Sequence, residues 1–451
     1  MRASTADKTR PAEVLSDLIA RATRKGATAA DAVLIHGTSM SVTQRLGERE
    51  NLNRSEGQTV GLRVLIGKRQ AIVSSTDLSA PTLDSLLERA LSMARIAPED
   101  PYCGLAEPEL LARSFPRLEL LDTTEPNGER LYERAAEIED AARAVKGVTN
   151  SDGAGASWGR GENTLVTSDG FVGSYATSMF SSSVSVVAGT GTGMETDYSS
   201  TRARFEEDLE DNAAVGKEAG ERAVRRLAPR KIESASLPIV LEPRISNSML
   251  GHFAGAISGA SIARGTSFLR KDMGKAVFSK DVTIVDDPHR IRGLGSRPFD
   301  GEGVTTRTMA LADAGVLKTW LLSSAPARQL GLRTTGHAAR SGAAPPGPSA
   351  SNLYMEPGDV TPEELMADIK LGVYVTELIG FGVNMITGDY SRGASGYLIE
   401  NGKKTSPISE FTIAGNLRTM FAAIVPADDL EFRYGSNAPT LRIDGMTVAG
   451  K

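Results

Sequence analysis

Histidines are the first residues to consider, because a zinc peptidase usually holds its metal with two of them on one helix. A glutamate beside the first histidine then acts as the general base. The chain has four histidines, which are His36, His252, His289 and His337. None is followed by a glutamate, and no two lie within six residues of each other. The sequence therefore lacks a zinc motif on a single helix, while a site built from distant ligands stays open.

One cluster combines acidic residues with a histidine, at Asp286, Asp287 and His289. It could hold a divalent ion, or it could end a strand over 282–285 and turn at Pro288. We favour the turn. His252 is expected on a helix, where a packed or solvated histidine is more common than a ligand. We therefore predict no catalytic, cofactor-binding or metal-binding residue in this chain.

Three glycine patterns resemble motifs of other enzymes but lack the flanking elements. Residues 155–159 match the nucleophile elbow around Ser157, which needs a strand before it and a helix after it. Glycines and charged residues on both sides argue against that context. Residues 61–68 resemble a phosphate-binding loop, but five residues separate the glycines and the interior is apolar like a strand. The Gly-Thr repeat at 189–193 is expected to be a flexible hairpin.

Composition excludes several function classes. The chain has 451 residues with 51 Lys+Arg against 56 Asp+Glu, a net charge of −5, which does not favour direct binding of nucleic acid. Basic residues also cluster over 222–231, but we expect them at the C-terminus of a helix, where they complement the helix dipole. Cys103 is the only cysteine, so neither an intramolecular disulfide nor a cysteine zinc cluster can form. No secretory signal or membrane-spanning run is visible, and we expect a cytoplasmic protein.

The elements that would position any site begin with two similar units. Helices are predicted over 11–25 and 81–96, with a strand at 32–35 and a hairpin at 62–73 between them. A second unit has helices over 129–146 and 209–227, with strands between them that include a hairpin turning at 168–170. Both units contain Glu-Arg-Ala followed by Ala-Pro, at 88–98 and 221–229. This favours an internal duplication, although chance similarity of such a short stretch is the rival.

From about residue 237 the sequence becomes rich in strand and turn signals. Helices are predicted within 246–263 and over 362–371, and hairpins turn at 313–315 and 401–402. A long Gly/Pro-rich loop lies between His337 and Asp359. We predict an α+β protein in which a duplicated α/β N-terminal region precedes a strand-rich, barrel-like domain. The expected domains are 1–110, 111–232 and 233–451.

Several collinear motifs in the C-terminal half resemble those of the TldD/TldE (PmbA) metallopeptidase family, also named for modulation of DNA gyrase. They are 286–288, SRPFDGEG at 296–303, SNLYM at 351–355, PGD at 357–359, TGDYSRGASGY at 387–397 and FTIAGN at 411–416. The strong matches span about 237–449. The N-terminal units are similar in layout but carry weaker motifs.

This resemblance implies a heterodimer in which TldD-type subunits carry a His-Glu-x-x-x-His helix and a downstream cysteine ligand. The corresponding helix here covers 247–264 and contains GHFAGAISG at 251–259, with neither glutamate nor a second histidine. The stretch at 434–439 has no cysteine. The chain therefore resembles the TldE-type subunit, which binds no zinc. We expect no cofactor in this chain and zinc in a TldD-type partner.

The resemblance also implies a role in degrading unfolded or extended peptides, in peptide antibiotic maturation and antitoxin turnover. A peptide could add as a strand to a sheet edge, and the loop 338–357 could line its path. A homodimer is an option when the partner is absent. The alternatives are an autonomous hydrolase using Ser157 or a dispersed metal site, and a non-enzymatic regulator of gyrase or an antitoxin.

Overall fold

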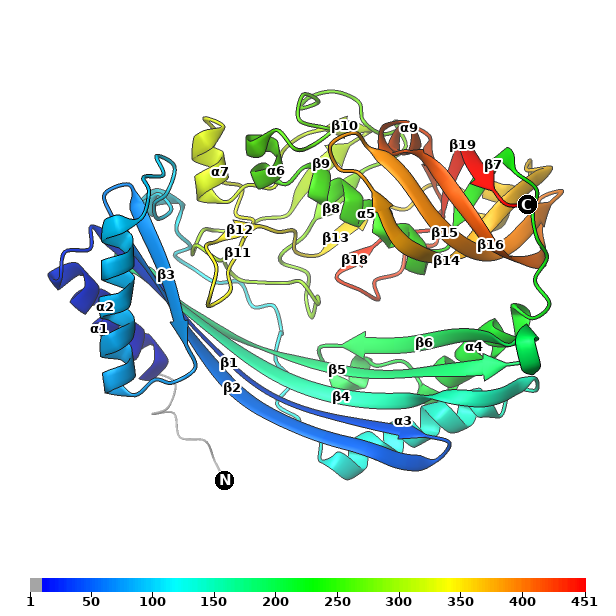
Figure 1. Cartoon of the computed structure of the whole chain (residues 1–451), viewed down its shortest axis with the longest axis horizontal. Helices are drawn as coiled ribbons and strands as arrows, with labels where there is room; N and C mark the ends of the chain where they lie inside the picture. The colour runs from blue at the N-terminus through cyan, green and yellow to red at the C-terminus, as the bar shows by residue number, and fades with distance from the viewer. Residues whose placement is uncertain (1–9) are drawn as a thin grey trace.

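The computed structural model describes residues 10–451, and its first half repeats one arrangement of elements (Figure 1). In each repeat, a helix, three antiparallel strands and a second helix follow one another. The first has α1 (Arg10–Arg24), β1 (Ala29–Arg45), β2 (Glu48–Ile66), β3 (Arg69–Ser75) and α2 (Ala80–Ile96). The second has α3 (Gly128–Arg143), β4 (Val148–Thr167), β5 (Val172–Ala188), β6 (Glu195–Ala203) and α4 (Asn212–Arg225). This recurrence agrees with the predicted duplication.

The two repeats share one six-stranded sheet in the order β3-β2-β1-β4-β5-β6. Its centre is an antiparallel pairing of β1 with β4, which runs from Asp31 opposite Thr167 to Gln44 opposite Ala154. The predicted strand at 32–35 was too short. Beyond residue 36 the sequence turns polar, and β1 continues because β2 and β4 pair with it on both sides.

The four helices cover one face of this sheet, and the C-terminal half lies over the other (Figure 1). Side chains alternate between the faces of a strand. Leu34 packs in the core under α1 and α2, and Val42 packs under α3. Val33, one residue away from Leu34, packs against Phe299 of the C-terminal half. The face under the four helices is apolar, because these amphipathic helices bury their apolar residues against it.

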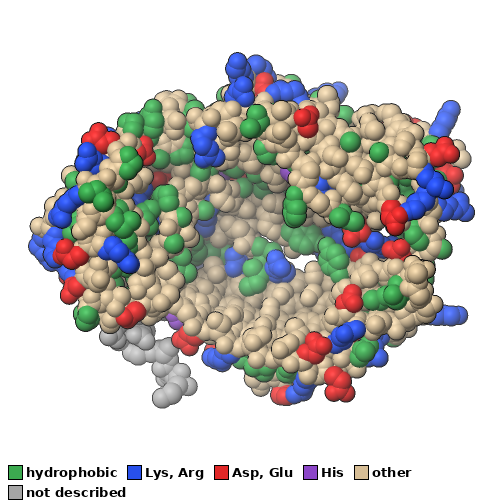
Figure 2. Space-filling model, viewed as in Figure 1, with side chains coloured by type: hydrophobic (Ala, Val, Ile, Leu, Met, Phe, Trp, Pro, Cys, Tyr) green, Lys and Arg blue, Asp and Glu red, His purple; other side chains and the backbone are tan. Residues whose placement is uncertain are grey.

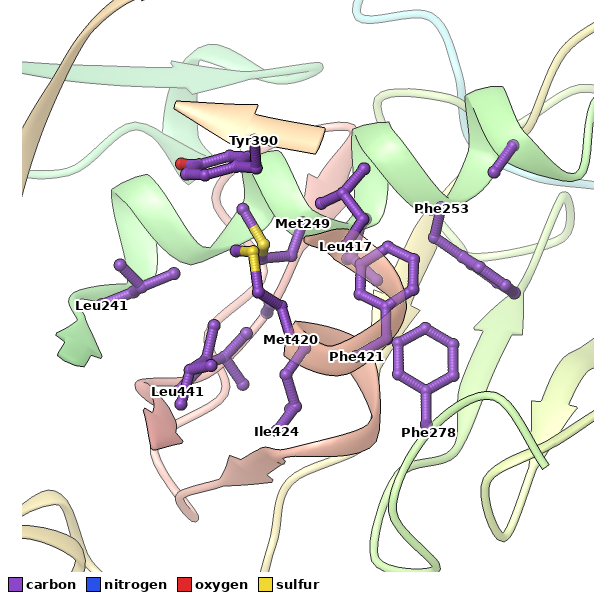
Figure 3. Packing of buried hydrophobic residues seen from close by; sticks show 14 of the residues in the cluster. Leu241, Met249, Phe253, Phe278, Tyr390, Leu417, Met420, Phe421, Ile424 and Leu441 are labelled. Carbon is purple, nitrogen blue, oxygen red and sulfur yellow. The ribbon is translucent and has the colours of Figure 1, made fainter. Parts of the chain in front are cut away.

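The C-terminal half contains a closed five-stranded barrel, which confirms the predicted fold class. Its strands are β7 (Ala235–Leu241), β14 (Leu371–Val383), β15 (Asp389–Glu400), β16 (Lys403–Asn416) and β19 (Leu441–Ala449). Pairing of β16 with β19 closes the ring, and β17 (Ile424–Pro426) extends β19. The helices α5 (Pro243–Ala256) and α9 (Leu417–Ala422) pack into the same core through Met249, Phe253, Met420 and Phe421 (Figure 3).

A second, irregular sheet lies beside the barrel, in the order β10-β9-β8-β13-β18. Its strands are β8 (Ile284–Asp286), β9 (Met309–Asp313), β10 (Val316–Leu317), β13 (Leu353–Met355) and β18 (Ser436–Asn437). The remaining short elements are β11 (Ala338–Ala339), β12 (Gly347–Pro348), α6 (Gly259–Arg264), α7 (Ser324–Gln329) and α8 (Pro362–Met366).

Several predicted elements need correction. The helix predicted within 246–263 is broken into α5 and α6 at Ile257 and Ser258. The helix predicted to reach residue 371 ends at Met366, because 371 already begins β14. The helix predicted from 209 starts at Asn212, where Asp211 accepts a hydrogen bond from the Ala214 amide as the N-cap.

Other expectations hold. The predicted turn at Asn401-Gly402 joins β15 to β16, and both residues have the positive φ that this sequence favours. The domain boundaries at 110 and 232 stay a prediction. The first two units share one continuous sheet, which does not itself mark a boundary between them. Among the described helices, none combines the length and the apolar composition needed to cross a bilayer.

Candidate functional site

Ser157 lies in the middle of β4 and not at a strand-to-helix turn. It stands opposite Ser41 of β1 and Ser181 of β5, and its hydroxyl lies 2.8 Å from that of Ser181. A nucleophile elbow needs an exposed, strained turn with a basic partner. The position of Ser157 therefore agrees with the argument against a catalytic role.

The cluster at 286–289 is split by the structure. Asp287 accepts hydrogen bonds from the His289 amide at 3.0 Å and from the Thr308 hydroxyl at 2.6 Å, which forms the predicted turn. Asp286 points elsewhere. Its carboxylate lies 3.1 Å from Nε2 of His337 and accepts from the amide and hydroxyl of Ser351. His289 and Asp286 therefore do not act together.

Asp286 and His337 form a buried pair that the sequence did not predict, with 1% and 2% of their surfaces exposed. Burial alone would raise the pKa of Asp286, but the hydrogen bonds from His337 and Ser351 outweigh it and lower that pKa. Nδ1 of His337 lies 2.8 Å from the Thr335 hydroxyl. The pair fastens the start of the Gly/Pro-rich loop to β8 and leaves no ring nitrogen free for substrate.

His252 lies on α5, the helix where the family resemblance places a zinc site. Its ring packs edge-on against Tyr390, with centroids 5.9 Å apart, and burial lowers its pKa. Nε2 of His252 has no hydrogen-bond partner among the described residues. Within residues 10–451, no three His, Cys, Asp or Glu side chains converge as metal ligands do. The donor set around His252 does not fit a zinc ion.

The glycine patterns belong to strands and turns. Residues 61–66 lie in β2 and 67–68 form its turn to β3, while 189–193 connect β5 to β6 through a short 3-10 turn. Gly61 has a packing role. A Cβ at this position would lie 2.1 Å from the carbonyl oxygen of Gly342, so the two backbones touch. This contact seats the Gly/Pro-rich loop on the sheet.

A hollow lies between the C-terminal half and the sheet face that carries no helices (Figure 2). Small polar side chains form much of that face, because serine alternates with valine along β5. Val184 and Val186 pack under the helices, whereas Ser181 and Ser183 point to the opposite side. Ser41 and Ser157 stand beside Ser181 on the neighbouring strands. The sheet therefore presents hydroxyl groups to the hollow.

Two adjoining cavities continue this hollow along the sheet. The larger, of about 330 Å³, lies between strands β1, β4 and β5 and the segment 294–297. The smaller, of about 140 Å³, lies between the same strands and the segments 299–301 and 338–340. Asn163, Tyr175 and Arg297 line both. Together they form a trough, a name we use for these two cavities from here on.

Charged groups surround the smaller cavity. Asp300 is buried, and burial together with the neighbouring Glu302 raises its pKa to about 7. Its carboxyl group accepts hydrogen bonds from the amides of Glu302, Val304 and Ala338. Asp300 thus anchors the loop at Ala338 and positions the arginine two residues later, Arg340, in the cavity wall.

The sequence reasoning missed Arg297, His337 and Arg340 as members of one region. Arg297 lies in the motif SRPFDGEG, His337 directly precedes the long loop, and Arg340 lies within it, so a signal was present for each segment. No local pattern indicated that these segments meet at the sheet. The predicted loop 338–357 lines the trough at its first residues and contains the short strands β11, β12 and β13.

Family models match three consecutive parts of the chain. They describe domain 1 of the PmbA/TldA metallopeptidases at residues 30–94, the central domain at 122–227 and the C-terminal domain at 234–450. Metalloprotease PmbA of Escherichia coli O157:H7 is 36% identical over 416 residues, which cover 92% of this chain and 90% of that relative.

Solved structures show the same fold over the whole length. A Bacteroides thetaiotaomicron protein named as a modulator of DNA gyrase aligns with a TM-score of 0.89 and 26% identity, covering 99% of this chain and 100% of the other. TldE from Thermococcus kodakarensis aligns with a TM-score of 0.87 over 97% and 100% of the two chains. At 18% identity the latter supports the fold alone.

Proposed function

The chain belongs to the PmbA/TldD metallopeptidase family, and from this membership we propose that it is the family's subunit without zinc. In this proposal the metal and the hydrolytic chemistry reside in a TldD-type partner, and the two form a cytoplasmic heterodimer. The complex degrades unfolded or extended peptides, as in peptide antibiotic maturation or antitoxin turnover. This chain itself needs no cofactor.

One observation carries the proposal. His252 is the sole histidine on α5, and a packed aromatic ring of Tyr390 lies beside it instead of further ligands. A catalytic zinc ion needs three protein ligands and an open position for water. Because the described residues offer no such set, the hydrolytic metal has to come from elsewhere if the family activity is retained.

The role left to this chain is to receive and shape the substrate. The hydroxyl-lined sheet face and the trough can accept a main chain without selecting bulky side chains. Strand β6 is also an edge of the sheet, and a cavity of about 390 Å³ separates its residues 200–202 from the segment 431–434. An extended peptide can pair with such an edge through main-chain hydrogen bonds, which are independent of sequence.

The test measures zinc content and peptide cleavage for the isolated chain, an isolated TldD-type partner and their mixture. We expect stoichiometric zinc in the partner and none in this chain, with cleavage of an unfolded substrate such as casein enhanced in the mixture. Size-exclusion chromatography should show a heterodimer, and a homodimer of this chain is compatible with the proposal when the partner is absent.

Other outcomes would support the competing functions. Cleavage by this chain alone, lost on Ser157→Ala or on chelation, would establish an autonomous hydrolase. Tight binding to gyrase or an antitoxin without turnover in any mixture would establish a regulator. Either result would replace the proposed function.

A further inference from the structure

Arg340 is a buried guanidinium that shares the carboxylate with which it forms an ion pair. Its side chain is 2% exposed and forms an ion pair with Asp31. The same carboxylate accepts a hydrogen bond from Nε of Arg63 at 2.6 Å, so two buried guanidinium groups share it. The buried Glu302 acts on both arginines by its charge but forms no ion pair with either in the described part of the chain. Nε and Nη2 of Arg340 have no hydrogen-bond partner among the described residues, although the side chain lines the smaller cavity of the trough.

Arg297 supplies a second group of this kind to the same cavity. Its two Nη atoms donate to the carbonyl oxygens of Ala338 and Ser349, which hold the guanidinium in place. Its Nε is buried and has no partner in the described part of the chain. No carboxylate within residues 10–451 forms an ion pair with Arg297. Among the described residues, the hydrogen-bond acceptors of its guanidinium are these two backbone carbonyls.

Asp300, in the wall of this cavity, does not supply the hydrogen-bond acceptors that Arg297 and Arg340 lack. Asp300 already accepts from three backbone amides, and it makes no hydrogen bond to either arginine. Leaving a buried charged donor without an acceptor is unfavourable, because the donor loses its hydrogen bonds to water and gains none in the protein. Such groups are rare in native proteins and call for an occupant of the site.

We propose that the cavity between Arg297 and Arg340 binds the carboxylate at the C-terminus of a peptide that lies along the trough. A carboxylate is a planar acceptor that matches the guanidinium donors. The cavity of about 140 Å³ accommodates this group and a small terminal side chain, and the adjoining cavity of about 330 Å³ receives the preceding residues. This proposal rests on the proposed function for the idea that the peptide is a substrate.

A phosphate group offers similar chemistry, but the site favours the carboxylate. Asp300 lies in the cavity wall, and the ionised form of its carboxyl group repels anions in this buried environment. A doubly charged phosphate meets more of this repulsion than a singly charged carboxylate. The walls contributed by Val33, Leu165 and Phe299 are apolar and also suit the end of a peptide better than a hydrated phosphate.

The test compares two forms of one short, N-terminally labelled peptide ending in alanine. One form has a free C-terminal carboxylate and the other a C-terminal amide. Binding to the isolated full-length chain is followed by fluorescence anisotropy. We expect the free acid to bind at least about tenfold more tightly than the amide, since a charge-assisted hydrogen bond is worth more than a neutral one.

Two variants locate the effect. Arg340→Gln should bind both forms equally, whereas Arg49→Gln, at an exposed arginine paired with Glu129, should keep the preference. Gly61→Ala changes no charge but collides with Gly342 and displaces the loop that carries Arg340. It should weaken the preference for the free acid. Gly57→Ala on the same strand places its methyl group in open space and should leave the preference for the free acid unchanged.

Equal binding of both peptide forms to the unaltered chain, or no binding of either, would overturn the proposal and leave water as the occupant. Competition by inorganic phosphate at lower concentrations than acetate would assign the site to phosphate and also overturn it. The proposed function fails separately, when the mixture with a TldD-type partner does not cleave peptides. A preference for the free acid would survive that failure.

Discussion

Asp286 is a buried carboxylate that connects segments far apart in the chain. It joins β8 to His337 at the start of the Gly/Pro-rich loop and to Ser351 near its end. Three hydrogen bonds hold the ionised form in a region that water does not reach. The loop is thus fixed at both ends, which explains how a segment so rich in glycine and proline can hold Arg340 in a defined place.

Asp286→Asn should destabilise the protein by about 2–4 kcal/mol at pH 7, because an amide cannot accept all three hydrogen bonds. The pKa of Asp286 is lower in the folded state than in the unfolded state. Its contribution is therefore present above pH ~4 and is lost as the pH falls through the folded pKa. Urea unfolding at several pH values should show the difference between the two proteins shrinking toward acid pH.

Asp313→Asn is a suitable comparison, because Asp313 pairs with Lys318 on the surface and its side chain is 53% exposed. This change should alter the free energy of unfolding by less than about 0.5 kcal/mol. An equal effect of both substitutions, or a constant difference at every pH, would contradict the assigned role of Asp286.

At the scale of elements, helix α3 holds the tip of the hairpin formed by β1 and β2. Glu139 of α3 is completely buried and accepts hydrogen bonds from the amides of Leu46 and Gly47, the turn between β1 and β2, and from the side chain of Gln44. Both turn residues have positive φ. One carboxylate thus satisfies the turn amides and keeps the polar ends of β1 and β2 against the rest of the sheet.

Glu139→Ala should lower the free energy of unfolding by about 2–3 kcal/mol, because the turn amides and Gln44 lose a charged acceptor. Hydrogen exchange should accelerate first at the tip of the β1–β2 hairpin. Glu133→Ala, on the same helix at a site with an exposed side chain, should change little. Unchanged protection of the hairpin tip in Glu139→Ala would show that the carboxylate does not hold it.

Across the whole molecule, charged side chains join the sheet half to the barrel half. Asp197 of β6 pairs with Arg244 of α5 at 2.7 Å, and Arg226 after α4 reaches Glu377 of β14 at 2.6 Å. A further contact between the halves is the aromatic pair of Phe171, between β4 and β5, with Phe299. The two halves are therefore joined by several separate contacts, which include the ion pair of Arg340 with Asp31.

Asp197→Ala should destabilise the protein by about 3–5 kcal/mol, because it leaves Arg244 buried and without its main partner. Calorimetry should show a lower midpoint, and hydrogen exchange should rise where β6 meets α5. Glu129→Ala removes an exposed pair with Arg49 and should leave both measurements nearly unchanged. An unaltered midpoint in Asp197→Ala would mean that the halves are held together by other contacts.

The sequence by itself determined the order of the elements, the duplicated layout and the absence of paired zinc ligands on α5. These are local properties, because helical periodicity, turn residues and neighbouring ligands all lie within a few positions of one another. The density of strand and turn signals after residue 237 extended the prediction to the fold class. Family motifs marked the segment around Arg297 without indicating what it does.

Tertiary structure alone decided which distant residues meet. The pairing of β1 with β4, the contact of His337 with Asp286 and the ion pair of Arg340 with Asp31 each join residues far apart in the chain. Such contacts follow from how the whole chain closes its sheets and buries its apolar faces. The alternation of serine and valine in β5 was visible in the sequence, but only the folded chain shows which face meets the hollow.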